Sequence, residues 1–411
     1  MMNLLRAAIN GVRNEIQSTG GGWFGSFGSS ALQSPSMPTP SGKSVTASTS
    51  LASSVVFDCV RKNAQVLAGM PLQYFEKDGN GNDVLVNDGD LYGILAESPN
   101  RDQTALEFWE GCSTQLSLKG NAYNEKLFLG KRLVGVRPLF GVQPMRDRDR
   151  GGFKYGIYDR GKWEVLPAEK VFHLRGFGAG DGLGMSTIAY GATSIGAALA
   201  ADETASSIFS NAMMTAGFLT SDQVLKPEQR DQLQKMLETF AGSSKAGKSM
   251  ILEAGLKWNA TQLNPDDAQL LETRRYSVED ICRWFGVPPI IVGHSAEGQT
   301  MWGSGVETIL LSWLTLGINP MANRIEARVR KDLQPVEKRR RGFFRFDRDA
   351  MLQMDSKAKG EFLQKMAGSG TLTANERRDI LGRPRHTDPN ADALLAQTAM
   401  APLDQLGENA K

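Results

Sequence analysis

The chain has 411 residues, of which 41% are hydrophobic and 22% are charged, a composition typical of a globular protein with two or three domains. Its 47 basic and 45 acidic residues leave a formal net charge of +2, so the overall charge offers no general attraction to nucleic acid or to an anionic membrane. The composition therefore excludes disordered and fibrous proteins, and any contact with nucleic acid has to be local.

Cysteine usage and the first residues give expectations about the compartment. Cys59, Cys112 and Cys282 are far apart and form no C-x-x-C pair, which argues against a zinc site or a disulfide framework and favours a reducing setting. The N-terminal sequence MMNLLRAAIN lacks the long apolar core of a secretory signal, so we expect the protein to stay in the cytoplasm.

Two uncharged segments, residues 182–201 and 308–323, have to be compared with membrane spans. The first consists mostly of Gly, Ala, Ser and Thr, and the second is shorter than the ~20 apolar residues that a bilayer requires. Both segments therefore predict buried helices and no contact with a membrane.

The first eighteen residues predict an amphipathic helix, and a run rich in Gly, Ser, Pro and Thr follows at about residues 18–50. That run has too little apolar surface to offset its ordering entropy, so we expect a mobile linker unless a neighbouring subunit holds it. The apolar stripe of the helix consists of Leu4, Leu5, Ala8, Ile9, Val12 and Ile16.

The first folded region mixes helices and strands. A helix with an apolar stripe from Val55 to Leu67 is stopped by Gly69 and Pro71, and the segments LQYFE and DVLV flank the turn residues DGNGN, which predicts a hairpin. A second helix begins at Thr104, which stands in capping-box spacing with Glu107, and Gly120 is placed to end it. Short alternating stretches over residues 121–174 then predict an antiparallel sheet, so this region is α+β.

A long helix over residues 186–214 is dominated by small side chains, which permit close packing between helices. A compact insert follows, with a helix that begins at Pro227, the loop GSSKAGKS, and a pair of strands, SMILE and LKWNATQL. Another long helix begins after Pro265 and ends at Gly286. The two long helices therefore bracket the insert.

A glycine-punctuated loop at residues 293–305 leads into a further long helix, in which Pro320 predicts a kink. The basic run at residues 338–341 and the strand FFRFD come next. Two short helices follow, the second beginning with Thr373 and Glu376 in capping-box spacing, and a polar tail ends the chain.

The segment GSSKAGKS, residues 242–249, matches the phosphate-binding pattern G-x-x-x-x-G-K-[ST] at every fixed position. A P-loop requires a buried strand before the glycine-rich turn and a helix that begins at the Lys-Ser pair. Here a helix precedes the motif and strands follow it, and no β-rich run ending in Asp follows to hold magnesium. The order favours a basic loop, with a P-loop NTPase as the alternative hypothesis.

Other possible chemical signals are weaker. The segment GFGAGDGLG, residues 176–184, lacks the spacing G-x-G-x-x-G and predicts a glycine-rich joint before the long helix. His173, His294 and His386 are too scattered to argue a metal cluster or a catalytic triad, and His173 is predicted to be a core or strand histidine. The run at residues 338–341 favours a solvated hairpin end over a nucleic-acid contact. We therefore expect no enzyme activity, no cofactor and no metal site.

These landmarks, in this order, resemble the short form of the tailed-bacteriophage portal protein family from about residue 53 to residue 384. The element FGVPP, which follows a helix with the pattern D-x-Q-x-x-E-x-R, is the most specific part of the resemblance. The other matching segments are SVVFDCVRKNAQVLAGMPL, SPN, GNAY, VFHLRGF, DGLGMS, INPMANRIEARV and GTLTANERRDILGRP.

The resemblance implies an α+β protein with the portal fold: an α+β wing, a two-helix stem, a small α/β clip insert, a kinked long helix and a short helical C-terminal crown. The implied divisions are residues 1–50 (amphipathic segment and linker), 51–185 (wing), 186–215 (first stem helix), 216–264 (clip), 265–289 (second stem helix), 290–303 (tunnel loop), 304–355 (kinked helix and returning wing strand) and 356–411 (crown and tail).

The function implied by the resemblance is a ring-shaped channel in the virion, at one vertex of a capsid assembled in the host cytoplasm. The ring would be a homo-oligomer, expected to be a dodecamer, through which double-stranded DNA is packaged and ejected. It would contact the major capsid protein and act as the docking site for terminase and for head-completion, adaptor or tail proteins. A monomeric DNA-binding adaptor is a further hypothesis.

The resemblance also assigns residues to these roles. In the clip, Lys245, Lys248 and Lys257 would meet an acidic partner surface or DNA at the channel mouth, and Pro320 would set the helix kink. The tunnel loop would bring six residues close to DNA: His294, Ser295, Glu297, Gln299, Thr300 and Met301.

Overall fold

The computed structural model divides the chain into two compact units, Met1–Phe346 and Asp347–Lys411. In the part of the chain that is described, no helix is long and apolar enough to cross a membrane. The structure describes residues 37–86, 88–149, 151–159, 161–210, 217–220, 227, 230–231, 257–260, 267–294, 304–348 and 356–394.

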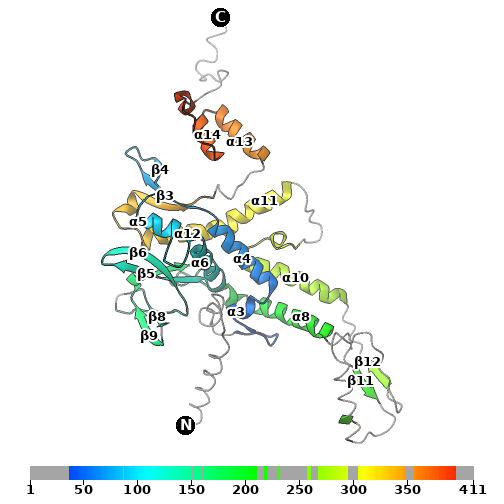
Figure 1. Cartoon of the computed structure of the whole chain (residues 1–411). Helices are drawn as coiled ribbons and strands as arrows, with labels where there is room; N and C mark the ends of the chain where they lie inside the picture. Colours follow the sequence, from blue (N-terminus) through cyan, green and yellow to red (C-terminus); the bar gives the residue numbers. More distant parts are fainter. Residues whose placement is uncertain are drawn as a thin grey trace. The chain divides into compact units, whose positions relative to one another are not determined.

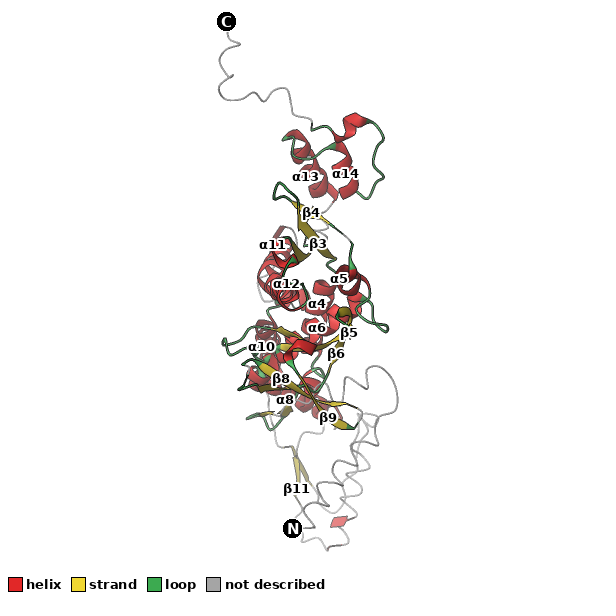
Figure 2. Cartoon of the chain, turned by 90° about the vertical axis from the view of Figure 1, so that its left-hand side faces the viewer, coloured by secondary structure: helices red, strands yellow, loops and turns green. Residues whose placement is uncertain are grey.

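Two helices form the centre of the first unit, and both were predicted. Helix α4 (Ser54–Ala68) ends at Gly69, and helix α6 (Ala105–Lys119) begins with the predicted capping box of Thr104 and Glu107. The helix α6 ends at Gly120, whose φ of 69° lies in the left-handed region that glycine adopts without strain. The two helices pack against each other (Figure 1), and strands β5 and β6 lie beside α6 in both views (Figures 1 and 2).

The predicted hairpin is confirmed as strands β3 (Leu72–Lys77) and β4 (Asp83–Leu85). The predicted strand FFRFD is β13 (Gly342–Phe346), which pairs antiparallel with β3. Phe346 packs edge-on against Trp109, with ring centroids 5.7 Å apart. The last strand of the first unit therefore closes a sheet that begins about 270 residues earlier in the chain.

Residues 121–174 form two three-stranded antiparallel sheets where the sequence predicted one. Their strand orders are β10-β5-β6 and β7-β8-β9. The chain leaves the first sheet at Gly141, whose φ is 65°, and the two sheets share a core that includes Tyr123, Phe153 and Tyr155. The strands are β5 (Asn121–Leu129), β6 (Arg132–Leu139), β7 (Gln143–Arg146), β8 (Phe153–Asp159), β9 (Lys162–Leu166) and β10 (Val171–Arg175).

The helix predicted over residues 186–214 is interrupted. Helix α7 (Thr187–Tyr190) is separated from helix α8 (Ala192–Ser210) by Gly191, whose ψ of 7° departs from helical geometry. A Cβ atom at Gly191 would lie 3.2 Å from the ring of Trp284, so the glycine allows another helix to approach at the break. Residues 211–214 lie outside the described residues.

The helix that carries Trp284 is α10 (Asp267–Phe285), which ends at Gly286 as predicted and packs against α8. Within the insert between these helices, β11 (Gly217–Thr220) pairs antiparallel with β12 (Lys257–Ala260). The predicted strand LKWNATQL is thus confirmed over Lys257–Ala260. Its predicted partner SMILE and the loop GSSKAGKS lie outside the described residues, and residue 227 is helical as expected.

The long helix after the loop is divided by a π-helical turn. Helix α11 (Ser304–Trp313) is followed by the π turn η5 (Leu314–Ile318) and by helix α12 (Asn319–Asp332). The N–H of Asn319 bonds to the carbonyl of Leu314, a spacing of five residues. Pro320 has no N–H to donate, and its ring excludes the carbonyl four residues before it, so the backbone widens directly before the proline.

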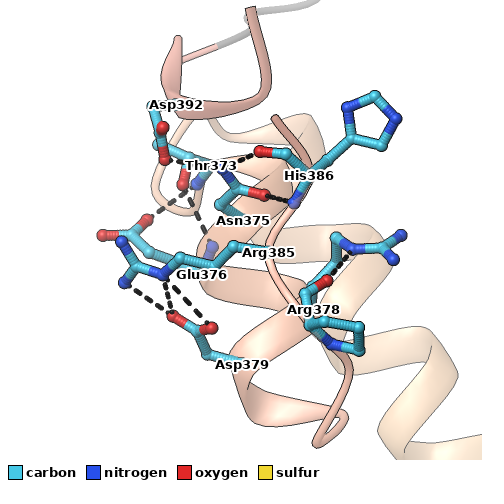
Figure 3. Close-up of polar contacts among 9 residues, drawn as sticks. Thr373, Asn375, Glu376, Arg378, Asp379, Arg385, His386 and Asp392 are labelled. Atoms are coloured by element: carbon cyan, nitrogen blue, oxygen red, sulfur yellow. Dashed lines mark hydrogen bonds and ion pairs between the residues drawn. The ribbon is translucent and has the colours of Figure 1, made fainter. Parts of the chain in front are cut away.

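The second unit contains the two short helices predicted near the C-terminus, α13 (Ser356–Gly368) and α14 (Ala374–Ile380). The predicted capping box of Thr373 and Glu376 is present. Figure 3 shows how the buried Asn375 holds the chain that follows: its side chain donates to the carbonyl of His386 (3.2 Å) and accepts from the N–H of His386 (2.7 Å).

Candidate functional site: the paired helices and the two joints at their base

The helices α8 and α10 are the two long helices predicted on either side of the insert, and the structure brings them together. The indole N–H of Trp284 on α10 donates to Oγ of Ser194 on α8 at 3.2 Å. The sequence predicted close packing of small side chains, and α8 buries Ala198 and Ala205 while α10 buries Ile281. The described part of the helix pair is therefore joined by close apolar packing and by the contact between Trp284 and Ser194.

The first joint lies where α10 ends, and Asn63 of α4 is at its centre. The amide of Asn63 donates to the carbonyl of Phe285 (3.1 Å), and its oxygen accepts from the indole N–H of Trp313 (3.3 Å). Only 5% of Asn63 is exposed. Since Phe285 ends α10 and Trp313 ends α11, a single side chain links three helices.

Neighbouring contacts strengthen this joint. Lys62, next to Asn63, donates to the carbonyl of Ile291 in the 3-10 turn η4 (Pro289–Val292). A Cβ at Gly317 would lie 3.0 Å from the carbonyl of Gly286, so the π turn comes close to the end of α10. The FGVPP segment is therefore held by α4 on one side and by the π turn on the other.

A pair of cysteines also joins α4 to α10. The sulfur atoms of Cys59 and Cys282 are 3.9 Å apart, and both residues are completely buried. The contact with Cys282 and the burial raise the pKa of the Cys59 thiol above its ordinary value. This thiol is therefore a neutral packing group between α4 and α10.

His294 is the one predicted tunnel-loop residue that the structure describes. Its Nε2 atom lies 3.5 Å from Oε1 of Glu279 on α10, and its N–H donates to the carbonyl of Pro289 at 3.0 Å. His294 also lines a cavity of about 260 Å³ with Arg275 and Asp202. The beginning of the loop is thus fixed to α10. The other predicted residues, Ser295, Glu297, Gln299, Thr300 and Met301, lie outside the described residues.

The remaining predicted site residues that the structure describes, Lys257 and Pro320, lie in different parts of the fold. Lys257 begins β12 opposite Thr220, whereas Lys245 and Lys248 lie outside the described residues. Pro320 lines a cavity of about 480 Å³ together with Trp284 and Gly317. Pro320 is therefore close to the first joint, and Lys257 belongs to the insert.

The second joint was not recognised as a site from the sequence, although its residues belong to three segments of the portal resemblance. GNAY, VFHLRGF and DGLGMS meet here because β5 and β10 pair in antiparallel register, with Arg175 opposite Asn121. Asn121 donates to the carbonyl of Gly184 (2.8 Å) and accepts from the N–H of Gly184 (2.9 Å). One side chain therefore fixes the glycine-rich segment that leads into α7.

Glycine is required where these segments cross. A Cβ on Gly184 would lie 1.8 Å from the carbonyl oxygen of Gly120, and a Cβ on Gly178 would lie 2.1 Å from the carbonyl oxygen of Leu183. The N–H of Gly176 donates to the Gly120 carbonyl at 2.7 Å. The predicted glycine-rich joint is therefore present, and it works through close approach of backbones.

His173 is the buried polar residue of this joint, as predicted for a core or strand histidine. It is 1% exposed in β10, and its Nε2 atom lies 2.9 Å from Oδ1 of Asn121. Its Nδ1 atom faces the hydroxyl of Tyr155 (3.1 Å) and the Nε of Arg175 (3.2 Å). Because Arg175 can only donate, Nδ1 accepts and Nε2 carries the proton. Burial, together with Arg175 and Arg328, lowers the pKa of His173 to about 2.

Neither joint has the arrangement of a catalytic site. His173 is neutral and its hydrogen bonds serve the fold. Among the described residues, no group of three His, Cys, Asp or Glu side chains could hold a metal ion. The basic run at residues 338–341 begins with the 3-10 turn Lys338–Arg340, in which the carbonyl of Arg339 accepts from Arg330. Both joints have a structural role. The first fixes the end of α10 to the α+β body, and the second fixes the segment that leads into α7 and α8.

The architecture defines a class: an α+β body joined to a helix pair that carries an insert between its two helices. The family model for phage portal proteins matches residues 54–382. This chain belongs to the phage portal protein family, which confirms the resemblance seen in the sequence. It is 31% identical to the portal protein of Enterobacteria phage HK97 over 374 residues, 87% of this chain and 84% of that protein.

Other relatives agree with this assignment. The probable portal protein of Streptomyces phage phiC31 is 28% identical, over 82% of this chain and 76% of that protein. The crystal structure of an HK97-family phage portal protein from Corynebacterium diphtheriae has a TM-score of 0.56 at 15% identity, covering 79% of this chain and all of that one. A chain of the native gene transfer agent virion gives 0.55 at 21% identity, over 83% and 94%. These structures confirm the expected α+β portal fold.

Proposed function

We propose that copies of this chain form a closed ring at one vertex of a virion capsid, and that double-stranded DNA passes through its hole during packaging and ejection. Membership of the portal family is the observation that carries this proposal. Similar chains come from the neck of gene transfer agent particles computed with C12 and with C6 symmetry, with TM-scores of 0.53 and 0.56. A ring of twelve subunits is compatible with both symmetries.

In this ring the helices α8 and α10 would form the stem, residues 216–264 the clip and residues 290–303 the tunnel loop. Helices that pack closely through small side chains suit a crowded wall around an axis. A net charge of +2 suits a channel that confines DNA without gripping it, because each neutralised phosphate adds affinity.

The clip would face terminase during packaging and head-completion, adaptor or tail proteins later, and the wing would contact the major capsid protein. Lys245, Lys248 and Lys257 would contribute positive charge to the clip. We assign no bond-breaking step to this chain, so the ATP used in packaging would be bound by the terminase. The P-loop NTPase remains the rival, and it requires nucleotide binding that depends on Lys248.

The experiment that tests the channel function is Pro320→Ala. The substitution restores a backbone N–H that can bond to the carbonyl of Leu316, which favours a regular helix over the π turn. The helix α11, which leads out of the tunnel loop, then changes direction. We expect rings of normal number and size but less DNA per capsid, measured as nuclease-protected DNA in purified particles.

Pro335→Ala is the matched control, since Pro335 is exposed and precedes a short turn outside the long helix. It should leave the DNA content unchanged. Capsids with Pro320→Ala that hold as much DNA as the wild type would contradict a role of this helix in the channel.

A further inference from the structure

A groove on the first unit has no role in either joint. It runs between α4 and α6 and has a volume of about 380 Å³. Its apolar lining includes Val60 and Ala64 of α4, Leu118 of α6, and Phe140. Phe57, at its edge, is 50% exposed. Two parallel walls of helix with apolar side chains between them are the form of site that accepts an amphipathic helix.

The α6 wall contains a glycine that the fold does not explain. Gly111 lies in the interior of α6 and lines the groove. Glycine inside a helix is destabilising relative to alanine, and a Cβ at this position would meet no atom within 4 Å. The missing side chain therefore leaves room for something outside the described residues to approach the backbone of α6.

We propose that the groove binds the N-terminal amphipathic segment of this chain, residues 1–17. The sequence predicts a helix there with an apolar stripe, within which Leu5, Ile9, Val12 and Ile16 have the spacing of anchors in a helical groove. The segment is long enough for four helical turns, and its apolar face needs a partner surface.

The charges of the segment and the groove are complementary. With 3.6 residues per turn, Arg6 and Arg13 lie about 90° to one side of the apolar stripe. Glu107 and Glu110 lie on the α6 wall of the groove. The two arginines therefore face the acidic wall when the stripe enters the groove.

The same geometry places an acidic residue on the other side. Glu15 lies on the opposite side of Leu5, Ile9, Val12 and Ile16 from the arginines, between Leu4 and Ala8. Arg61, which also pairs with Asp58, lies on the α4 wall. One direction of the helix along the groove thus matches the charges of both walls, whereas the reversed direction would bring like charges together.

Residues 17–36 join the segment to the described chain. Residues 17–36 are rich in Gly and Ser, and a flexible linker of that length has a root-mean-square span of about 25 Å. The described chain then begins with strand β1 (Met37–Pro38) and reaches Leu51, which itself lines the groove.

Photo-cross-linking in the full chain tests the proposal. Benzoylphenylalanine is incorporated in place of Phe57, the purified protein is irradiated, and the cross-linked peptides are identified by mass spectrometry. We expect cross-links to peptides from residues 1–17. Cross-links to any other part of a second copy, or no cross-link at all, would overturn the proposal.

Charge reversal then tests the orientation. Arg6→Glu combined with Arg13→Glu should lower the cross-linking yield about fivefold, the upper range for pairs at a surface. Glu110→Arg should restore part of it; Glu107 is left unchanged because its carboxylate belongs to the capping box of α6. The matched control is Glu164→Arg in β9, on the other sheet, which should have no effect. A cross-linking yield that does not change when the arginines are substituted would contradict the proposed orientation.

Gly111→Leu separates groove blocking from damage to the fold. Leucine favours a helix more than glycine does, so the melting temperature should stay equal or rise, while the new side chain fills the groove and the cross-link falls to background. An unchanged yield with Gly111→Leu would also overturn the proposal. The arginine variants change none of the described residues, so they give a result even where Gly111→Leu fails to fold.

Discussion

Asn121→Leu is expected to lower the free energy of unfolding of the first unit by about 3 kcal/mol, since each intramolecular hydrogen bond contributes roughly 0.5–1.5 kcal/mol net. The side chain of Asn121 makes four hydrogen bonds, with Lys119 O (3.1 Å), Gly184 O (2.8 Å), Gly184 N (2.9 Å) and His173 Nε2 (2.9 Å). Leucine has the same branched side-chain shape but pairs with none of these groups.

The loss should lower the urea concentration at the midpoint of unfolding and leave the dependence of the free energy on urea concentration unchanged. Asn80→Leu is the matched control, because Asn80 is exposed in the turn between β3 and β4, and it should change the free energy by less than about 0.5 kcal/mol. Equal effects of the two substitutions would show that Asn121 does not hold the second joint together.

Acidification is expected to destabilise the fold through His173. Its pKa is about 2 in the folded chain, against an ordinary value of 6.5, so the unfolded chain binds more protons between these two pH values. The stability contributed by the neutral imidazole is therefore complete above pH 6.5 and is lost as the pH falls below it. Between pH 6.5 and 5 this amounts to about 2 kcal/mol.

His173→Gln removes the titrating group and isolates its contribution. We expect the wild type to lose about 2 kcal/mol more than the variant between pH 7 and pH 5, as measured by urea unfolding at both pH values. The comparison uses the change in the free energy of unfolding between the two pH values, so it remains valid even though the variant is less stable at every pH. Parallel pH profiles for the two proteins would refute the assignment of a neutral, buried His173.

Local sequence signals predicted the helices of the first unit well. The capping box at Thr104, the stop at Gly69 and the glycine at position 286 all act within one or two turns of the chain, and the structure has helix ends at each of them. The hairpin of β3 and β4 was predictable for the same reason. Its turn residues and its strands are neighbours in sequence.

Features that depend on distant contacts could not be predicted in this way. The break at Gly191 accommodates Trp284, more than ninety residues away, so the small-residue pattern alone indicated one continuous helix. The division of residues 121–174 into two sheets depends on which strands pair, and alternation does not encode pairing.

The candidate site could be predicted only in part, because it also depends on contacts between residues that are distant in sequence. The portal resemblance identified the segments GNAY, VFHLRGF and DGLGMS, but only the register of β5 and β10 shows that Asn121, His173 and Gly184 meet. Asn63, which links three helices at the first joint, falls within the apolar stripe that the sequence predicts from Val55 to Leu67. No local signal marks a polar residue in such a stripe as a junction.

The central claim is that copies of this chain close into a ring around a pore. Electron microscopy of the purified full-length protein, with rotational averaging of end-on particles, tests it most directly. The account predicts closed rings, with twelve subunits as the expected number, around a central hole wide enough for a DNA duplex. Particles that remain discrete monomers at every concentration, or assemblies without a central hole, would contradict it.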